Sequence, residues 1–146
     1  MESIWWYIFD IMGTLAFAVS GVLVAVSKRM DLFGIFVLAA STAIGGGIIR
    51  DLMLGHTPPI ALQSSLYFFL IIAAMLGTTA IIRYFDANIR SKVMHHSAYI
   101  YLAGDTIGLA SFTITGTLSG LYFNPDMWVL IITLGVITAV GGGVIR

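Results

Sequence analysis

The sequence predicts an all-α polytopic membrane protein, and its composition is the first reason. Of its 146 residues, 59% are hydrophobic and 10% are charged, and the mean hydropathy is +1.00. A soluble domain carries roughly a quarter of charged residues, so a chain this apolar belongs in a bilayer. The formal net charge of zero argues against a nucleic-acid partner, because few phosphates could be neutralised. Cysteine is absent, which excludes disulfides and thiolate metal sites.

The second reason is the length of the apolar stretches. A helix needs about 20 predominantly apolar residues to cross roughly 30 Å of hydrocarbon. Short connections with turn residues separate the stretches, and Pro58-Pro59 suits the first turn of a helix, where a missing backbone donor costs little. We predict five helices, at residues 4–26, 32–54, 60–82, 98–122 and 127–146.

The third reason is an internal repeat. Residues 42–50 read TAIGGGIIR, and residues 138–146 read TAVGGGVIR. A second pattern, Asp-x-x-Gly-x-x-x-Phe-x-x-[Ser/Thr]-Gly, precedes each copy and begins at Asp10 and at Asp105. Glycine-broken apolar segments in corresponding halves are typical of internally repeated transport proteins. The sequence predicts a three-helix repeat at residues 1–83, a cytoplasmic linker at 84–97 and a second repeat at 98–146.

Positive charges predict how the chain lies in the membrane. Lys28 and Arg29 follow the first predicted helix, and Arg83, Arg90 and Lys92 follow the third. The positive-inside rule places both connections in the cytoplasm and the amino terminus outside. With three spans in a unit, the two copies then run in opposite directions, so the repeat is inverted.

The second repeat is incomplete in this sequence. It stops at Arg146, whereas the first unit continues after Arg50 with Asp51 and a third helix. We therefore expect the native polypeptide to continue through at least one more helix. An in-frame stop codon directly after Arg146 in the natural gene would refute this expectation.

The triglycine segments are the strongest candidates for a functional site. Gly45 lies about 20 Å into the second predicted span at 1.5 Å per residue, and therefore inside the bilayer. Each glycine costs a helix about 1 kcal/mol relative to alanine, but it permits bending and close approach of backbones. One interpretation is a tight helix crossing. The duplication favours kinked second and fifth helices that line a pore or a substrate site. The pore-lining candidates are Gly45, Gly46, Gly47, Gly141, Gly142, Gly143, Ser41, Thr42 and Thr138.

Charged residues in or at the ends of the spans form a second group of candidates. Ionisable groups in membrane helices are costly and usually face a partner or an aqueous cavity. The inverted arrangement places Asp10 and Arg50 toward the outer face, and Asp105 and Arg146 toward the inner face. We hypothesise that each Asp–Arg set, with Asp51, lines a vestibule and either pairs or presents opposite charges to permeating ions. Arginines that snorkel to the interface and structural salt bridges are the alternatives.

Aromatic residues form a third group. Phe17 and Phe112 occupy equivalent places near the middle of their spans, and they are candidates for a hydrophobic constriction. Packing of the small-residue stripes around them is the alternative. Six aromatic residues fall at predicted span ends, as interfacial anchors do: Trp5, Trp6, Tyr7, Tyr99, Tyr101 and Trp128.

The sequence does not indicate bond-making chemistry. His56, His95 and His96 lie in predicted connections without a second ligand at metal-binding spacing, so we predict no metal site and no cofactor. Nucleotide-binding loops, zinc-protease helices and nucleophile elbows are missing from the sequence. We therefore expect the protein not to be an enzyme.

The glycine segments also carry a family resemblance. Residues 45–59, which read GGGIIRDLMLGHTPP, and residues 141–146, which read GGGVIR, resemble the prokaryotic branch of the trimeric intracellular cation (TRIC) channels. The resemblance covers essentially the whole chain. It implies a seven-helix protomer in a bacterial or archaeal inner membrane, built from two inverted three-helix repeats and a final helix. It also implies a homotrimer in contact with membrane lipids, with a separate pore for potassium and sodium in each protomer.

In that family the second and fifth helices kink at their glycines and line the pore. The Lys-containing lipid-binding motif of the animal members is not evident at residues 132–134.

Three functions follow as hypotheses. The leading one is a monovalent cation channel, in which carbonyls and hydroxyls line a narrow neck. The second is a secondary transporter of a small neutral substrate such as glycine, since broken helices at a repeat interface are equally typical of carriers. The third is a non-conducting membrane scaffold.

Overall fold

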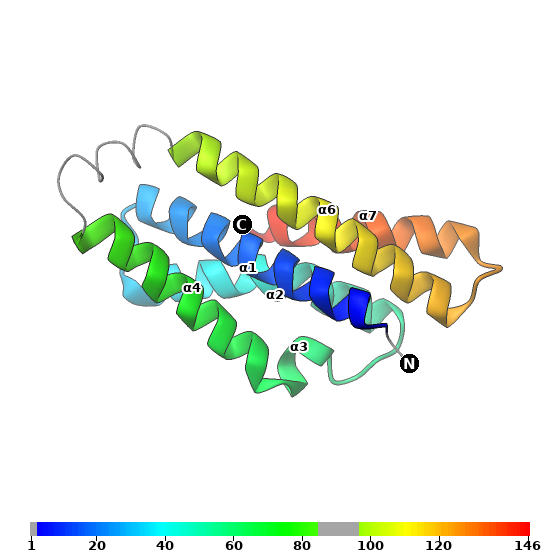
Figure 1. Cartoon of the computed structure of the whole chain (residues 1–146). Coiled ribbons are helices and arrows are strands. Elements are labelled where there is room, and N and C mark those ends of the chain that lie inside the picture. Colours follow the sequence, from blue (N-terminus) through cyan, green and yellow to red (C-terminus); the bar gives the residue numbers. More distant parts are fainter. Residues whose placement is uncertain (1–2, 85–96) are drawn as a thin grey trace.

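The computed structural model describes residues 3–84 and 97–146, and within these ranges every regular element is a helix. The helices are α1 (Ile4–Ser27), α2 (Leu32–Met53), α3 (Ile60–Gln63), α4 (Ser65–Tyr84), α6 (Ser97–Phe123) and α7 (Trp128–Ile145) (Figure 1). The all-α prediction is confirmed, and most helix ends lie within one or two residues of their predicted positions.

The single helix predicted at residues 60–82 is wrong, because the structure has two helices there. α3 is one turn that follows Pro59, and Ser64 after it is extended, with φ −103° and ψ 120°. The Ser64 hydroxyl accepts a hydrogen bond from the backbone N–H of Leu66 at 3.3 Å. Such a local bond competes with continuation of a helix, and apolar composition does not reveal it.

Side-chain caps determine where α1 and α2 begin. Ser3 Oγ accepts a hydrogen bond from the N–H of Trp6 at 3.3 Å, and Asp31 Oδ1 accepts one from the N–H of Gly34 at 2.9 Å. Between the two helices, Arg29 adopts the left-handed conformation, with φ 56°, that commonly ends a helix. The connection from α1 to α2 is therefore a tight turn.

α1 lies in the middle of the bundle and contacts α2, α4 and α6 (Figure 1). One apolar core joins α1 to α2 and α4, and it comprises Ala18, Val22, Ala25, Ile35, Ala39, Ala43, Ile71 and Met75. Several of these side chains are alanines, which let membrane helices approach closely.

α1 and α6 lie side by side in opposite directions (Figure 1). The Phe112 ring of α6 lies against Gly13 of α1, and the Phe17 ring of α1 lies against Gly108 of α6. A Cβ atom added to Gly13 would come within 2.7 Å of the Phe112 ring, and one added to Gly108 within 2.5 Å of the Phe17 ring. Both positions therefore require glycine, and the two contacts are reciprocal.

α2 and α7, which carry the two triglycine segments, also run in opposite directions (Figure 1). Each copy of the repeated pattern is thus reversed relative to the other, as an inverted repeat predicts. The bounds of the two units and their sidedness in the membrane stay predictions. The predicted linker at 84–97 lies almost entirely outside the described residues.

Four of the helices in the described ranges are long and apolar enough to cross a membrane: α1, α2, α4 as far as Ile82, and α7. α6 has 27 residues, but glycine, serine and threonine lower its apolar character. Large apolar side chains such as Phe33, Phe69 and Val144 lie exposed on the surface, at 73%, 65% and 76%. Such a surface is costly in water and favourable against lipid.

Candidate functional site

The first charged cluster surrounds Arg50 near the end of α2. The Arg50 guanidinium donates from Nη1 to Asp10 Oδ1 and from Nε to Asp51 Oδ1, each at 2.9 Å. Tyr67 of α4 donates its hydroxyl to Asp10 Oδ2 at 2.5 Å. The guanidinium carbon lies 4.6 Å from the centre of the Trp6 ring, a cation–π distance. We call Trp6, Asp10, Arg50, Asp51 and Tyr67 the first cluster.

The first cluster is shielded from the surroundings and its carboxylates are well paired. The Arg50 and Asp10 side chains are 2% and 5% exposed. Asp51 Oδ2 accepts a further hydrogen bond from the N–H of Ile60 at 2.8 Å, which ties the end of α2 to the start of α3. Buried charges persist when opposite charges and hydrogen bonds compensate their desolvation. One guanidinium faces two carboxylates here, so the cluster holds an excess of negative charge.

The second charged cluster surrounds Arg146 at the end of α7. Its Nη2 donates to Asp105 Oδ1 at 2.8 Å and to the Tyr101 hydroxyl at 2.7 Å, and its Nη1 donates to Ser20 Oγ at 2.5 Å. The guanidinium carbon lies 4.6 Å from the centre of the Tyr101 ring. The Arg146 and Asp105 side chains are 7% and 21% exposed, so this cluster is more open. We call Ser20, Tyr101, Asp105 and Arg146 the second cluster.

The structure thus brings together both predicted Asp–Arg sets, and it adds aromatic residues that the sequence interpretation missed. Trp6 was predicted as one of six aromatic anchors at span ends, but it is fully buried against Arg50 and so does not face lipid. Its indole N–H donates to Ser119 Oγ at 2.8 Å. A signal was present in the sequence: Trp6 and Tyr101 each stand four residues before the aspartate of the repeated pattern, Asp10 or Asp105. That spacing places them on the same helix face.

The triglycine segments form the crossing of α2 and α7. A Cβ atom added to Gly46 would overlap the backbone carbonyl of Thr138, and one added to Gly142 would overlap that of Thr42. A Cβ atom on Gly141 would lie 3.0 Å from the Gly46 Cα. Backbone therefore contacts backbone in the middle of the bundle, which side chains would prevent.

The outer members of the two triplets lie differently. A Cβ atom on Gly45 would meet the Ile145 side chain, whereas one on Gly143 would meet nothing within 4 Å. Gly47 is buried, with Arg50 Nη2 nearest to its added Cβ at 3.7 Å. Both helices continue through their glycines without interruption. A bend within these helices, and a pore beside them, stay predictions.

The hydroxyl residues predicted beside the glycines differ in their hydrogen bonds. Thr42 is fully buried and donates to the Leu38 carbonyl at 2.7 Å, one helical turn before it. Thr138, its counterpart on α7, is also fully buried, but among the described residues its Oγ1 has no hydrogen-bond partner. Ser41 is half-buried. An unpaired buried hydroxyl is uncommon and requires an explanation.

Phe17 and Phe112, the predicted constriction, meet between α1 and α6. Their ring centres lie 5.3 Å apart, and the rings are 0% and 1% exposed. Ala139 of α7 completes this apolar cluster. The two rings fill the space left by Gly13 and Gly108, so packing alone accounts for their positions.

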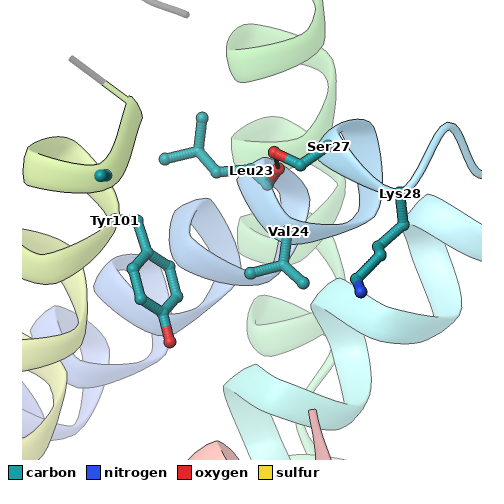
Figure 2. Close-up of a pocket in the computed structure, with 6 residues that line it drawn as sticks. Leu23, Val24, Ser27, Lys28 and Tyr101 are labelled. Atoms are coloured by element: carbon teal, nitrogen blue, oxygen red, sulfur yellow. Dashed lines mark hydrogen bonds between the residues drawn. The ribbon is translucent and has the colours of Figure 1, made fainter. Parts of the chain in front are cut away.

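A cavity of about 280 Å³ lies beside the second cluster (Figure 2). It is lined by Leu23, Val24, Ser27, Lys28, Ala98 and Tyr101. Figure 2 shows the Tyr101 ring of α6 beside the last turns of α1, from which Lys28 extends. Tyr101 therefore belongs both to the cavity wall and to the second cluster.

Comparison with known proteins identifies the family. The family model described as "Glycine transporter" matches residues 7–83 and 102–146. A UPF0126 membrane protein of Vibrio cholerae is 41% identical over 140 residues, which cover 96% of this chain and 55% of that protein. The UPF0126 inner membrane protein YadS of Escherichia coli K12 is 37% identical over 141 residues, which cover 96% of this chain and 63% of that protein. The chain thus spans less than two thirds of the length of these relatives.

Solved structures agree with this assignment. The TRIC trimeric intracellular cation channel orthologue from Rhodobacter sphaeroides superposes with a TM-score of 0.81 at 33% identity, over 97% of this chain and 68% of that one. A second solved structure, from work on the structural basis for conductance through TRIC cation channels, superposes with a TM-score of 0.72 at 40% identity. The match covers 95% of this chain and 64% of that one. The chain therefore belongs to the family of membrane proteins that the glycine-transporter model describes and that includes the prokaryotic TRIC channels.

Proposed function

We propose that this chain forms the greater part of a monovalent cation channel that conducts potassium and sodium. The observation that carries the proposal is the likeness to a TRIC cation channel at a TM-score of 0.81 and 33% identity. In the proposed path, ions pass beside the triglycine segments of α2 and α7, between the first cluster on one side and the second cluster on the other. The chain spans only part of the length of its relatives, so the activity of the whole protein is part of this proposal.

Two features of the crossing support its role as the narrow part of the path. Glycine leaves backbone carbonyls without covering side chains, and carbonyls and hydroxyls are the usual ligands for dehydrated monovalent cations. The Thr138 hydroxyl is buried there without a partner among the described residues. Under this proposal, the close approach of Gly46 to the Thr138 carbonyl would be the closed state of the path. In the open state α2 and α7 would separate or slide, which is easier where no side chains interlock.

The charged clusters are proposed to flank the two vestibules. The excess carboxylate of the first cluster would favour cations over anions. The cavity beside Tyr101 is proposed as part of the second vestibule. By the distribution of positive charge, the first cluster would face outside and the second the cytoplasm, with the amino terminus outside.

The assembly is proposed to be a homotrimer with one path in each protomer. The structural relative from Rhodobacter sphaeroides is described as trimeric. The exposed apolar surface of the helices is compatible with contacts to lipid and to other protomers. The inner membrane is the proposed location, since the Escherichia coli relative is an inner membrane protein.

Recordings from the purified protein in planar bilayers test the channel. We expect unitary current steps that reverse near the potassium potential under bi-ionic conditions. Thr138→Val removes only the unpaired hydroxyl and should lower the unitary conductance. Thr133→Val is the matched control on the same helix, because Thr133 is half-buried and its hydroxyl already donates to the Val129 carbonyl at 2.7 Å. Equal unitary conductance in the two variants would show that the Thr138 hydroxyl does not line the ion path.

A second candidate function is secondary transport of glycine. The description of the matching family model favours it, and a sealed crossing between oppositely oriented halves is also typical of alternating-access carriers. Proteoliposomes loaded with unlabelled glycine distinguish the two functions. Saturable counterflow of labelled glycine without unitary currents would establish the carrier and overturn the channel.

A further inference from the structure

A second cavity, more polar than the first, lies where α1 turns into α2. Its volume is about 320 Å³, and α4 closes it from the other side. It is lined by Val26, Arg29, Met30, Asp31, Leu32, Ile35, Thr79 and Ile82. This volume falls at the lower end of ligand pockets, roughly 300–1,000 Å³. The cavity lies at the ends of three helices that are candidate membrane spans, so it is at the level of lipid headgroups.

Three polar side chains in this cavity are available to a ligand. Arg29 is exposed, and within the described residues its guanidinium forms no ion pair. Asp31 uses Oδ1 to cap α2 and so keeps Oδ2 for another donor. Thr79 Oγ1 is buried and has no partner within the part of the chain that the structure describes. A guanidinium, a carboxylate and a hydroxyl therefore line the same small space.

The polar cavity continues into an apolar groove between α2 and α4. Asp31 and Leu32 also line a neighbouring hollow whose other walls are Phe33, Phe36 and Met75. Phe36 in turn lines a third hollow that extends to Ile44 and Ile71. Along α2, Leu32 to Ile44 covers about 18 Å at 1.5 Å per residue. The hydrocarbon layer of one leaflet is about half of the roughly 30 Å thickness of the bilayer core. The length of the groove is therefore close to the depth that an acyl chain spans in one leaflet.

We propose that this cavity and groove bind a phospholipid with a zwitterionic headgroup that carries a primary amine, namely phosphatidylethanolamine. Arg29 and the Thr79 hydroxyl bind the phosphate, and the free oxygen of Asp31 accepts from the ammonium group. An acyl chain lies along Phe36 between α2 and α4. A lipid with a net negative headgroup fits less well because Asp31 repels it, and a choline headgroup has no N–H to donate.

Native mass spectrometry of the purified protein, exchanged into dioleoyl lipids, tests this proposal. Phosphatidylethanolamine should be retained about tenfold more tightly than phosphatidylcholine or phosphatidylglycerol, a difference of about 1.4 kcal/mol. Soluble phosphoethanolamine at the same concentration should not displace it, because the groove holds the acyl chain. Equal retention of all three lipids would overturn the proposal, and so would a preference for phosphatidylglycerol.

Four variants assign the binding to this cavity. Arg29→Gln should lower retention of phosphatidylethanolamine about tenfold, and Thr79→Val should lower it less. Asp31→Asn keeps the helix cap, since asparagine caps as well as aspartate, but should abolish the preference over phosphatidylcholine. Lys28→Gln is the matched control, because the adjacent Lys28 lines the cavity of Figure 2 instead. An equal loss with Lys28→Gln would show that only surface charge matters and would overturn the assignment.

Discussion

The two arginine clusters are built from matching residues but lie in different surroundings. In each, an arginine that follows a triglycine pairs with an aspartate and stacks on the aromatic ring four residues before that aspartate. Asp10 of the first cluster is 5% exposed, whereas Asp105 of the second is 21% exposed. Within the described residues, the same local motif thus forms one enclosed and one partly exposed ion pair.

Within the described residues, the two clusters differ in the elements that cover them. Tyr67 of α4 and the start of α3 enclose the first cluster, because they supply donors to Asp10 and Asp51. Among the described residues, the second cluster is held by α1, α6 and α7, with Ser20 as its additional hydroxyl. Local sequence thus forms the ion pair, and the neighbouring helices determine its exposure.

The α2–α7 crossing shows the opposite behaviour, since its two halves are alike. Gly46 lies against the Thr138 carbonyl and Gly142 against the Thr42 carbonyl, and both are buried. We therefore expect paired variants to differ between the clusters and to agree at the crossing.

Removal of the first arginine should have the largest effect. Arg50→Ala leaves Asp10 and Asp51 buried without their cation, which should lower the free energy of unfolding by about 3–5 kcal/mol. Thermal or denaturant unfolding in detergent measures this loss. Arg50→Lys should recover part of the stability, because it restores the charge but not the forked geometry. A loss below that of Arg146→Ala would contradict the contrast between the clusters.

Alanine at the crossing should have the next largest effect. Gly46→Ala and Gly142→Ala each place a Cβ atom on a backbone carbonyl, so each should cost about 1–3 kcal/mol in unfolding free energy. Gly143→Ala is the control, because its Cβ atom meets nothing within 4 Å. It should be neutral or slightly stabilising, by up to about 1 kcal/mol. Clearly unequal losses at Gly46 and Gly142 would show that the crossing is not symmetrical.

Removal of the second arginine should cost less. Arg146→Ala removes hydrogen bonds to Asp105, Tyr101 and Ser20, but the remaining carboxylate is already 21% exposed. We expect a loss of about 1–2 kcal/mol, measured by the same unfolding experiment. High salt should weaken the wild-type contribution of this pair more than that of the first cluster. If the stabilisation from neither cluster changed with salt concentration, the two clusters would be equally shielded from solvent.

The smallest effect should come from the tyrosine hydroxyls. Tyr67→Phe deprives the buried Asp10 carboxylate of one donor, for a loss of about 1 kcal/mol. Tyr101→Phe removes an acceptor from Arg146, which retains Asp105 and Ser20, and should cost less. Chemical denaturation of the two variants side by side resolves the order. The reverse order would mean that the second cluster depends more on its aromatic residue than the first.

Much of the fold could be predicted from the sequence. Long apolar stretches predicted the helices, because backbone groups in lipid must be satisfied within the helix. The break at Ser64 was missed, since a single hydrogen bond from the backbone N–H of Leu66 to the Ser64 hydroxyl marks it.

For the site, the repeated Asp and Arg positions indicated which charges would meet. The burial of Trp6 was missed, because an aromatic residue at a span end has the same pattern whether it faces lipid or an arginine.

The sequence by itself determined the helices, the duplicated pattern and the positions of the repeated Asp, Gly and Arg residues. The apolar character of a stretch and the spacing of a repeated pattern are properties of the sequence, and they do not depend on which helices are neighbours. Only the tertiary structure decided that Gly46 contacts the Thr138 carbonyl, that Tyr67 encloses Asp10, and that Thr138 lacks a partner among the described residues. These contacts join positions far apart in the chain, and their exposure and geometry follow from how the helices cross.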